Sequence, residues 1–373
     1  MALRKKIRIG LVGAGGIALT SHLPWYRLHP GVRLAAVADT DEKKLRLARR
    51  AFGIPRGFSD ASELFASGEV DAVDICTPPW CHEEQVAGAA AAGLHILCEK
   101  PLGLNAAQTR RMLKAVGEAG VILQVGFQKR FNPGFIKMRE MIRDGRIGKV
   151  TGARVNWDFW YPDLGAPQFR RIVEAAGRLG VDLGREFGLW RASDARSGGW
   201  SLIDASIHYV DTLRYLMGEI AEVSCETRAV RTDAVNEDYS LLTLGFENGA
   251  MASIENNLNI VGRMMGDEGG TIQGTDGSLR FRVAPVNSLV PFSLEHYSYG
   301  NIASNRWTRV PMPPGTEILQ YKHQIDRFIG AVAGRIPRHV RAAGPDTGAD
   351  SLRAIRVIRA AYRAAGSGRK VKL

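Results

Sequence analysis

A glycine-rich turn directly follows the first apolar strand of the chain. The run 7–12 reads as a buried strand, and Gly13, Gly15 and Ala18 follow it at the spacing G-x-G-x-x-A, with a helical stretch after them. Gly13 permits a tight turn, Gly15 lets the backbone approach a pyrophosphate, and Ala18 lets the helix pack closely on the strand. The free N–H groups at the start of such a helix attract phosphates. The turn therefore predicts a dinucleotide site that includes Gly13, Gly15, Gly16, Ile17 and Ala18.

An acidic residue stands where this kind of site requires one. Asp39 ends the second expected strand, 33–39, about 20 residues beyond the glycines. A carboxylate at this place accepts hydrogen bonds from both hydroxyls of an adenosine ribose and repels a 2′-phosphate. The pattern predicts NAD as the cofactor, in preference to NADP. The alternative, a glycine-rich turn that binds nothing, is disfavoured because the acid is present.

Strands and helices alternate through the first third of the chain. Further strands are expected over 70–76, 95–98 and 121–125, with helices over 41–52, 83–92 and 106–119 between them. Alternation at this pace is typical of βαβ units and of a doubly wound parallel sheet. We therefore predict an α/β Rossmann domain over residues 1–127.

The pattern changes after residue 128. One helix is expected over 201–217, and period-two runs occupy 150–157, 222–230, 239–246, 250–258, 271–274, 278–283 and 292–297. Asn248-Gly249 and Asp276-Gly277 are strong signals for two-residue hairpins. We predict an α+β domain over 128–373, with a large, mainly antiparallel sheet covered by helices on one face and a cleft shared with the first domain. A C-terminal helix is expected at about 347–365, where it can pack back on the first domain.

The net charge of +12, from 50 Lys or Arg and 38 Asp or Glu, invites a nucleic-acid hypothesis. However, residues 323–373 hold 11 Lys or Arg against 3 Asp, which accounts for +8 of that total. There, four arginines share one helix face, and four apolar residues share the packed side: Arg353, Arg356, Arg359 and Arg363, then Leu352, Ile355, Ile358 and Tyr362. No aromatic residues interleave with the arginines, as a single-strand binder would require. We expect a solvated or subunit-facing helix surface and no nucleic-acid partner.

The cysteines and the apolar runs bear on location. The four cysteines, Cys76, Cys81, Cys98 and Cys225, form no C-x-x-C pair, which favours reduced thiols in the cytoplasm. The spacing of Cys81, His82 and Cys98 matches no familiar zinc site, so no metal is predicted. The longest early uncharged run, 9–26, is broken by glycines and polar residues and predicts no membrane span. The first residues do not resemble a signal peptide.

Lys100 lies where open α/β sheets keep their sites, just after the expected strand 95–98 and between Glu99 and Pro101. A lysine beside a cofactor can hydrogen-bond a substrate hydroxyl and stabilise a developing alkoxide. The alternative is a surface lysine paired with Glu99. The position at a strand end favours the functional hypothesis.

Asp204 and His208 form a second candidate pair, four residues apart on one expected helix. A carboxylate beside an imidazole fixes its tautomer and raises its basicity, so that the histidine can accept an alcohol proton. The alternative is that Asp204 caps the helix and His208 is an ordinary buried histidine. The spacing alone favours neither.

Taken together, these motifs resemble the glucose–fructose oxidoreductase and inositol dehydrogenase (Gfo/Idh/MocA) family over nearly the whole chain. The marks are Gly13-Ala-Gly-Gly-Ile-Ala18, Asp74-Ile-Cys-Thr-Pro-Pro79 with His82, Cys98-Glu-Lys-Pro101, Gly126-Phe-Gln-Lys-Arg-Phe-Asn-Pro133, Ser197-Gly-Gly199, the Asp204/His208 pair and Gly274-Thr-Asp-Gly-Ser278. The resemblance implies a Rossmann domain, a sheet domain whose open face often makes dimers or tetramers, and oxidation or reduction of a sugar or cyclitol hydroxyl.

The resemblance also implies residue roles. Lys100, Asp204 and His208 would form the catalytic group, with His208 as the proton acceptor or donor. The nicotinamide side would be lined by Thr77, Pro78, His82, Glu99 and Gln128. Trp190 and Arg191 resemble a pair that touches cofactor or substrate in some members. The substrate contacts we predict are Lys100, Trp157, Arg191, Asp204 and His208.

Two departures from the family pattern bear on the substrate. Ser206 stands where the family often has glycine, and the insertion 161–196, with a helical segment at about 168–176, is long enough to be a lid or a subunit arm. Our leading hypothesis is an NAD-dependent dehydrogenase of a sugar, sugar derivative or inositol. The alternatives are a glycosidase that retains NAD through oxidation, elimination, water addition and reduction, and a non-catalytic NAD-bound sugar sensor.

Overall fold

The computed structural model describes residues 6–159, 161, 171, 174–175, 190–231, 234–259, 267–283, 292–303, 305–341 and 348–373. The chain forms two compact units. The first unit comprises Met1–Phe131 and Leu319–Arg353, and the second comprises Asn132–Ile318 and Ala354–Leu373. The first unit therefore includes a segment from the C-terminal part of the chain. The predicted segment at about 168–176 lies almost wholly outside the described residues.

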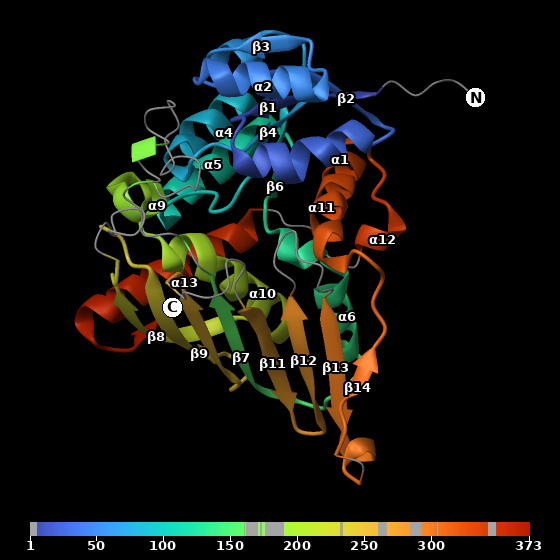
Figure 1. Cartoon of the computed structure of the whole chain (residues 1–373), viewed down its shortest axis with the longest axis vertical. Helices are drawn as coiled ribbons and strands as arrows, with labels where there is room; N and C mark the ends of the chain where they lie inside the picture. The colour runs from blue at the N-terminus through green and yellow to red at the C-terminus, as the bar shows by residue number, and fades with distance from the viewer. Residues whose placement is uncertain are drawn as a thin grey trace. The chain divides into compact units, whose positions relative to one another are not determined.

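The first unit is built on a parallel sheet of six strands in the order β3-β2-β1-β4-β5-β6 (Figure 1). The strands are β1 (Ile7–Val12), β2 (Val32–Ala38), β3 (Arg56–Phe58), β4 (Ala72–Ile75), β5 (His95–Cys98) and β6 (Leu123–Val125). This confirms the predicted doubly wound sheet. The strand order reverses between β1 and β4, and that reversal places a ligand crevice at the carboxyl ends of the strands.

Several helices of the first unit pack around its sheet, and two of them are capped at both ends. The helices of this unit include η1 (Ala18–His22), α1 (Leu23–Leu28), α2 (Glu42–Phe52), α3 (Ala61–Ala66), η2 (Pro79–Cys81), α4 (His82–Ala91), α5 (Ala106–Ala119), η3 (Gln128–Phe131) and α12 (Arg338–Arg341). Asp41 caps α2 by accepting from two backbone N–H groups, and Gly53 ends it with a φ of 68°. Asn105 and Gly120 do the same for α5. The short β3 and α3 carry too little pattern to be predicted.

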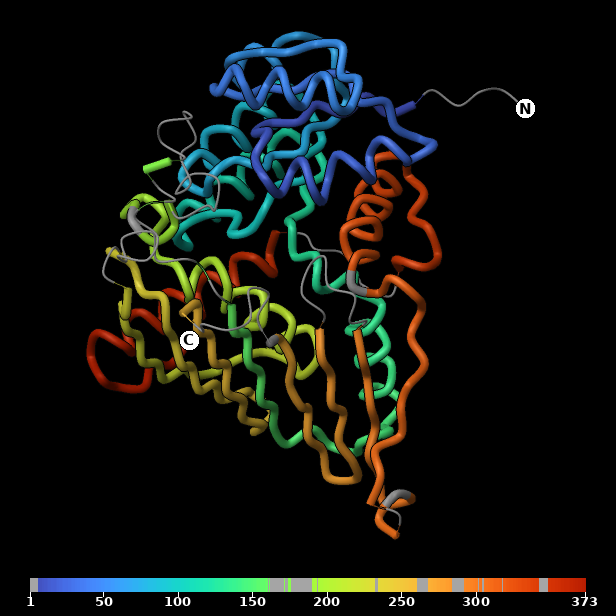
Figure 2. Tube along the Cα trace, viewed as in Figure 1, coloured from blue at the N-terminus to red at the C-terminus, as the bar shows by residue number. Residues whose placement is uncertain are grey.

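Helix α11 (Thr316–Val332) belongs to the core of the first unit. Its residues Ile325 and Phe328 are fully buried against Ile9 of β1 and Tyr26 of α1. The trace in Figure 2 follows this return of the chain from the second unit. The burial of these apolar side chains helps to stabilise the first unit.

The second unit contains a nine-stranded sheet in the order β14-β13-β12-β11-β7-β10-β9-β8-β15. Its strands are β7 (Val150–Asp158), β8 (Ile220–Arg228), β9 (Tyr239–Phe246), β10 (Met251–Asn257), β11 (Asp267–Gly274), β12 (Gly277–Val283), β13 (Ser293–Ser298), β14 (Thr308–Val310) and β15 (Val371–Lys372). Among the described strands of this sheet, only β7 and β10 pair in parallel, so the predicted mainly antiparallel sheet is confirmed.

Helices cover one face of this sheet. They are α6 (Pro133–Arg143), α9 (Trp190–Ser193), η5 (Ala195–Ser197), η6 (Ser201–Ser206), α10 (Ile207–Met217) and α13 (Ala349–Ser367), which begins at the boundary of the units. The short η7 (Tyr299–Asn301) follows β13 at the end of the sheet. Phe135 of α6 contacts Phe281 of β12 with ring centroids 5.3 Å apart. Leu241 and Met251 are 41% and 60% exposed, so the opposite face of the sheet is left open.

Two predictions about helices need correction in detail. The helix expected over 201–217 starts as the π-helical turn η6 and becomes α-helical only from Ile207. In α13, Ile355 and Ile358 are buried and Arg353, Arg356 and Arg363 are exposed, as predicted. Arg359 does not share the outer face, because its guanidinium donates to the carbonyl of Gly198 at 3.2 Å. No helix in the described part of the chain is long and apolar enough to cross a membrane.

Candidate active site

The glycine-rich loop after β1 leaves room for a ligand. Gly13 has a φ of 91°, and a Cβ there would lie 2.9 Å from Cγ2 of Thr77. A Cβ on Gly15 or Gly16 would meet no described atom within 4 Å. Gly13 is therefore required by the fold itself, whereas Gly15 and Gly16 keep open a space where a phosphate can approach the backbone.

Asp39 is fixed at the end of β2 by two backbone groups. Its Oδ2 accepts from the N–H of Ala14 at 2.7 Å, and its Oδ1 accepts from the N–H of Asp41 at 2.7 Å. The carboxylate thus joins the glycine-rich loop to the start of α2. Each oxygen keeps a further lone pair for a ribose hydroxyl.

The residues predicted on the nicotinamide side follow three neighbouring strands, β4, β5 and β6. Thr77 and Pro78 come after β4, Glu99 and Lys100 after β5, and Gln128 after β6. Carboxyl ends of parallel strands meet at one edge of a sheet, so these residues gather there. His82 is buried below them, with its ring nitrogens 2.9 Å from the carbonyl oxygens of Thr77 and Pro101. It ties two of these loops together.

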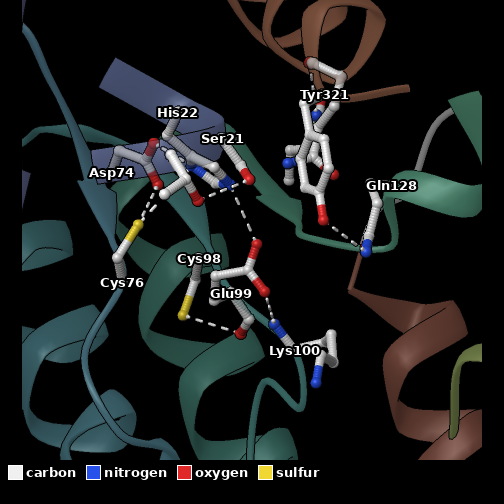
Figure 3. Close-up of polar contacts among 12 residues, drawn as sticks. Ser21, His22, Asp74, Cys76, Cys98, Glu99, Lys100, Gln128 and Tyr321 are labelled. Carbon is white, nitrogen blue, oxygen red and sulfur yellow. Dashed lines mark hydrogen bonds and ion pairs between the residues drawn. The ribbon is translucent and has the colours of Figure 1, made fainter. Parts of the chain in front are cut away.

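Gln128 and Tyr321 present polar groups beside Glu99 (Figure 3). The amide of Gln128 donates to the hydroxyl of Tyr321 at 3.3 Å, while its Oε1 is buried and accepts no hydrogen bond from the described residues. A buried amide oxygen of this kind needs a donor. The carboxamide of a nicotinamide is such a donor.

Sequence reasoning missed a buried polar group next to these residues. His22 of η1 is fully buried, with Nδ1 at 2.7 Å from Oδ2 of Asp74 and Nε2 at 3.2 Å from Oε1 of Glu99. The available signal was Asp74 within an otherwise apolar strand, because a buried carboxylate requires a partner. The ligand atoms of His22, Asp74 and Cys76 lie within 4.8 Å of one another, but their hydrogen bonds to each other account for the arrangement.

In the second unit, Arg191 links two predicted site residues. Its Nε lies 3.0 Å from Oδ2 of Asp204, and its guanidinium carbon lies 4.3 Å from the ring centre of Trp190. Tyr161 is packed nearby, 5.2 Å from the ring of Trp200. Burial raises the pKa of Tyr161, Arg191 lowers it and Asp204 raises it further. Asp204 is therefore held by an arginine as well as lying near His208 in the chain.

His208 lies over an aromatic and acidic part of the same unit. Its ring centre is 5.4 Å from that of Trp157, at the end of β7. Glu268 of β11 pairs with Trp157 across the sheet and accepts a hydrogen bond from Tyr209 at 2.6 Å. The structure thus brings Trp157 and His208 together. Lys100 lies in the first unit, and Asp204 and His208 lie in the second.

Both parts of the chain match known protein families. Residues 7–127 match the model of an oxidoreductase family described as an NAD-binding Rossmann fold, and residues 135–280 match a GFO/IDH/MocA C-terminal domain. The residues around the glycine-rich loop fit that cofactor, because the open space at Gly15, the carboxylate of Asp39 and the buried oxygen of Gln128 suit a dinucleotide.

Three known proteins are similar over most of their length. The chain is 31% identical to inositol 2-dehydrogenase of Rhizobium meliloti, over 98% of this chain and 99% of that protein. It is 31% identical to myo-inositol 2-dehydrogenase of Thermotoga maritima, over 68% and 70%. The crystal structure of the WlbA dehydrogenase from Bordetella pertussis, in complex with NADH and UDP-GlcNAcA, superposes with a TM-score of 0.78 at 26% identity, over 100% of this chain and 99% of that one.

Proposed function

The chain belongs to the Gfo/Idh/MocA family of NAD-binding oxidoreductases, and from that premise we propose that it is an NAD-dependent dehydrogenase of an inositol or a sugar. The proposal rests on two groups of polar residues, one in each unit. The first unit offers a dinucleotide loop with Lys100 and Glu99 beside it, and the second offers His208 over Trp157. The preference for NAD over NADP rests on Asp39.

Bound NAD would supply the hydride acceptor. His208 would take the proton of the substrate hydroxyl, and Lys100 would donate a hydrogen bond to the same oxygen as negative charge develops on it. Asp204, which Arg191 holds in place, would supply a negative charge close to His208 when the imidazole becomes positively charged. Trp157 presents an aromatic face suited to the C–H side of a ring substrate.

The relatives named above are dehydrogenases, so the glycosidase hypothesis is not favoured. A sensor would not need Lys100, Asp204 and His208 together. A dimer or tetramer built on the open sheet face and a cytoplasmic location remain predictions, as does the proposed set of site residues.

The test is turnover of NAD⁺ by the purified chain with a panel of inositols, aldoses and sugar acids. Growth of the NADH absorbance band with one substrate class supports the proposal. Lys100→Ala should lower kcat by at least about 100-fold while NADH still binds. Lys114→Ala is the matched control, because Lys114 is an exposed lysine of α5 that pairs with Glu118. Full activity of Lys100→Ala would contradict the mechanism, and glycoside cleavage without net NADH would point to the glycosidase.

A further inference from the structure

A buried histidine lies between two carboxylates in the first unit (Figure 3). His22 is completely buried, and its two ring nitrogens face Oδ2 of Asp74 at 2.7 Å and Oε1 of Glu99 at 3.2 Å. The hydride-transfer mechanism uses neither His22 nor Asp74. Glu99, in contrast, is one of the residues proposed to line the nicotinamide side.

Both carboxylates lie within ion-pair distance of the imidazole. A neutral imidazole donates from only one nitrogen, whereas an imidazolium donates from both. Burial by itself lowers the pKa of His22, but Asp74 and Cys76 raise it well above the ordinary value. Burial raises the pKa of the Cys76 thiol, which lies 3.5 Å from Oδ1 of Asp74, so Cys76 stays neutral. A protonated His22 would thus pair with Asp74 and lie 3.2 Å from the Glu99 carboxylate.

Neighbouring groups restrict the position of the Glu99 carboxylate. A Cβ at Gly126 would lie 2.5 Å from Oε1 of Glu99, so a larger residue there would displace the carboxylate. The backbone N–H of Lys100 donates to Oε2 at 3.2 Å. The side chain of Glu99 is 10% exposed, and this exposed part is where it can act on a ligand.

We propose that His22 is a positioning residue that keeps Glu99 ionised and fixed, so that the Glu99 carboxylate favours the oxidised over the reduced cofactor. The oxidised nicotinamide ring carries a positive charge and the reduced ring is neutral, and a fixed carboxylate discriminates between them through Coulomb attraction. Without His22, a buried Glu99 would take up a proton, since an uncompensated buried charge is costly. This inference rests on the proposed function.

The other titratable groups around this cluster do not compete for the charge. They are Cys76 beyond β4, Cys98 of β5, His82 of α4, Tyr26 of α1, Tyr321 of α11, and Lys100 next to Glu99. Burial raises the pKa of both thiols and of Tyr26, and it raises that of Tyr321 to about 12. Burial lowers the pKa of His82.

The first experiment needs no cofactor. NMR of the full chain with isotope-labelled histidine reports whether each imidazole carries one proton or two. We expect His22 to be doubly protonated around neutral pH in the wild type, and its pKa to fall in Glu99→Gln and in Asp74→Asn. A neutral His22 in the wild type would overturn the inference whatever the protein binds, and so would one tightly bound metal ion per chain in elemental analysis.

The second experiment compares the dissociation constants of NAD⁺ and NADH by fluorescence and calorimetric titration. His22→Gln and Glu99→Gln should each shift the ratio of the two constants by about tenfold towards NADH. The double variant should shift it no further, because both changes remove the same charge. Raising the pH should restore the wild-type ratio in His22→Gln, where Glu99 can ionise again, but not in Glu99→Gln.

A matched control separates this role from a structural one. His95 of β5 is a partly buried histidine whose Nδ1 accepts from the N–H of Ile122 at 3.1 Å, and His95→Gln should leave the ratio unchanged. Equal weakening of NAD⁺ and NADH by His22→Gln and by Glu99→Gln would show a structural role only and overturn the inference. If neither dinucleotide binds the wild type, the proposed function fails, and the NMR result still decides the state of His22.

Discussion

The backbone N–H of Ala14 donates to the Asp39 carboxylate at 2.7 Å, which ties the glycine-rich loop to the end of the neighbouring strand β2. The acid therefore has a role in shaping the loop in addition to its expected role against a ribose. Both roles depend on the same carboxylate, so one substitution tests them together.

Replacing Asp39 with alanine should raise the dissociation constant of NADH about tenfold, the effect of losing one hydrogen bond to a charged group. The affinity for NADPH should fall less or rise, because the 2′-phosphate no longer meets a negative charge. Fluorescence titration with both cofactors measures the change. Asp41→Asn is the control, since Asp41 caps α2 and asparagine caps equally well. An unchanged NADH-to-NADPH ratio in Asp39→Ala would refute the predicted role of Asp39.

Gly13 and Gly15 should respond differently to alanine. Gly13→Ala forces a side chain into a φ of 91° and against Thr77, so the free energy of unfolding should fall by about 2 kcal/mol. Gly15→Ala meets no described atom and should leave the free energy of unfolding within about 1 kcal/mol of wild type. The same substitution should weaken NADH binding, because the methyl group fills the space left for the phosphates. Denaturant melts and cofactor titrations measure the two effects, and strong NADH binding by Gly15→Ala would argue against this loop as the site.

Arg191→Met should lower kcat at least about tenfold, because Arg191 holds Asp204 at 3.0 Å. Arg196→Met is the matched control, since Arg196 forms an exposed pair with Asp194. Exposed ion pairs contribute about 0–1 kcal/mol, and both pairs are partly exposed, so both variants should melt close to the wild type. Equal kcat values for the two variants would exclude a role for Arg191 at the site.

The stability conferred by His22 should depend on pH. Burial opposes protonation of His22, but Asp74 and Cys76 raise its folded pKa above the ordinary value. Its contribution is therefore at full size below the unfolded pKa of about 6.5 and is lost as the pH rises through the folded pKa. At mildly acidic pH the wild type should exceed His22→Gln by about 3 kcal/mol in unfolding free energy. This difference should shrink in alkaline buffer.

The contribution of His95 to stability should change with pH in the opposite direction. Burial lowers its folded pKa, with a smaller opposing effect of Asp71. The difference between wild type and His95→Gln should therefore grow as the pH rises towards about 6.5. Urea melts at a series of pH values test both histidines. The same pH trend for the two variants would be incompatible with the assigned charge states.

Secondary structure was predictable wherever the sequence carried a strong period. The expected strand 239–246 coincides with β9, and 150–157 lies within β7. The π-helical turn η6 was not predictable, because a change from five-residue to four-residue hydrogen bonding leaves no mark in the apolar pattern. The inward turn of Arg359 was missed for a similar reason. Its spacing matches that of the other arginines, and the carbonyl of Gly198 that binds it is distant in sequence.

The candidate site divides in the same way. Gly13, Asp39 and Lys100 were found because each occupies a defined place relative to a strand. His22 was not found, since its two partners, Asp74 and Glu99, are more than 50 residues away in the sequence. Gly199 of the Ser197-Gly-Gly199 motif is another residue whose role depends on a partner distant in sequence. A Cβ on Gly199 would overlap the hydroxyl of Tyr362, which itself donates to Glu237.

By itself, the sequence determined the alternating strands and helices of a Rossmann unit, the glycine-rich loop and the family, because these depend on local turns, caps and periodicity. Only the tertiary structure decided that α11 completes the core of the first unit, that Arg191 holds Asp204, and that the His22 ring lies between Asp74 and Glu99. Those arrangements arise when residues far apart in the chain are buried together and their charges and hydrogen bonds must be satisfied by one another.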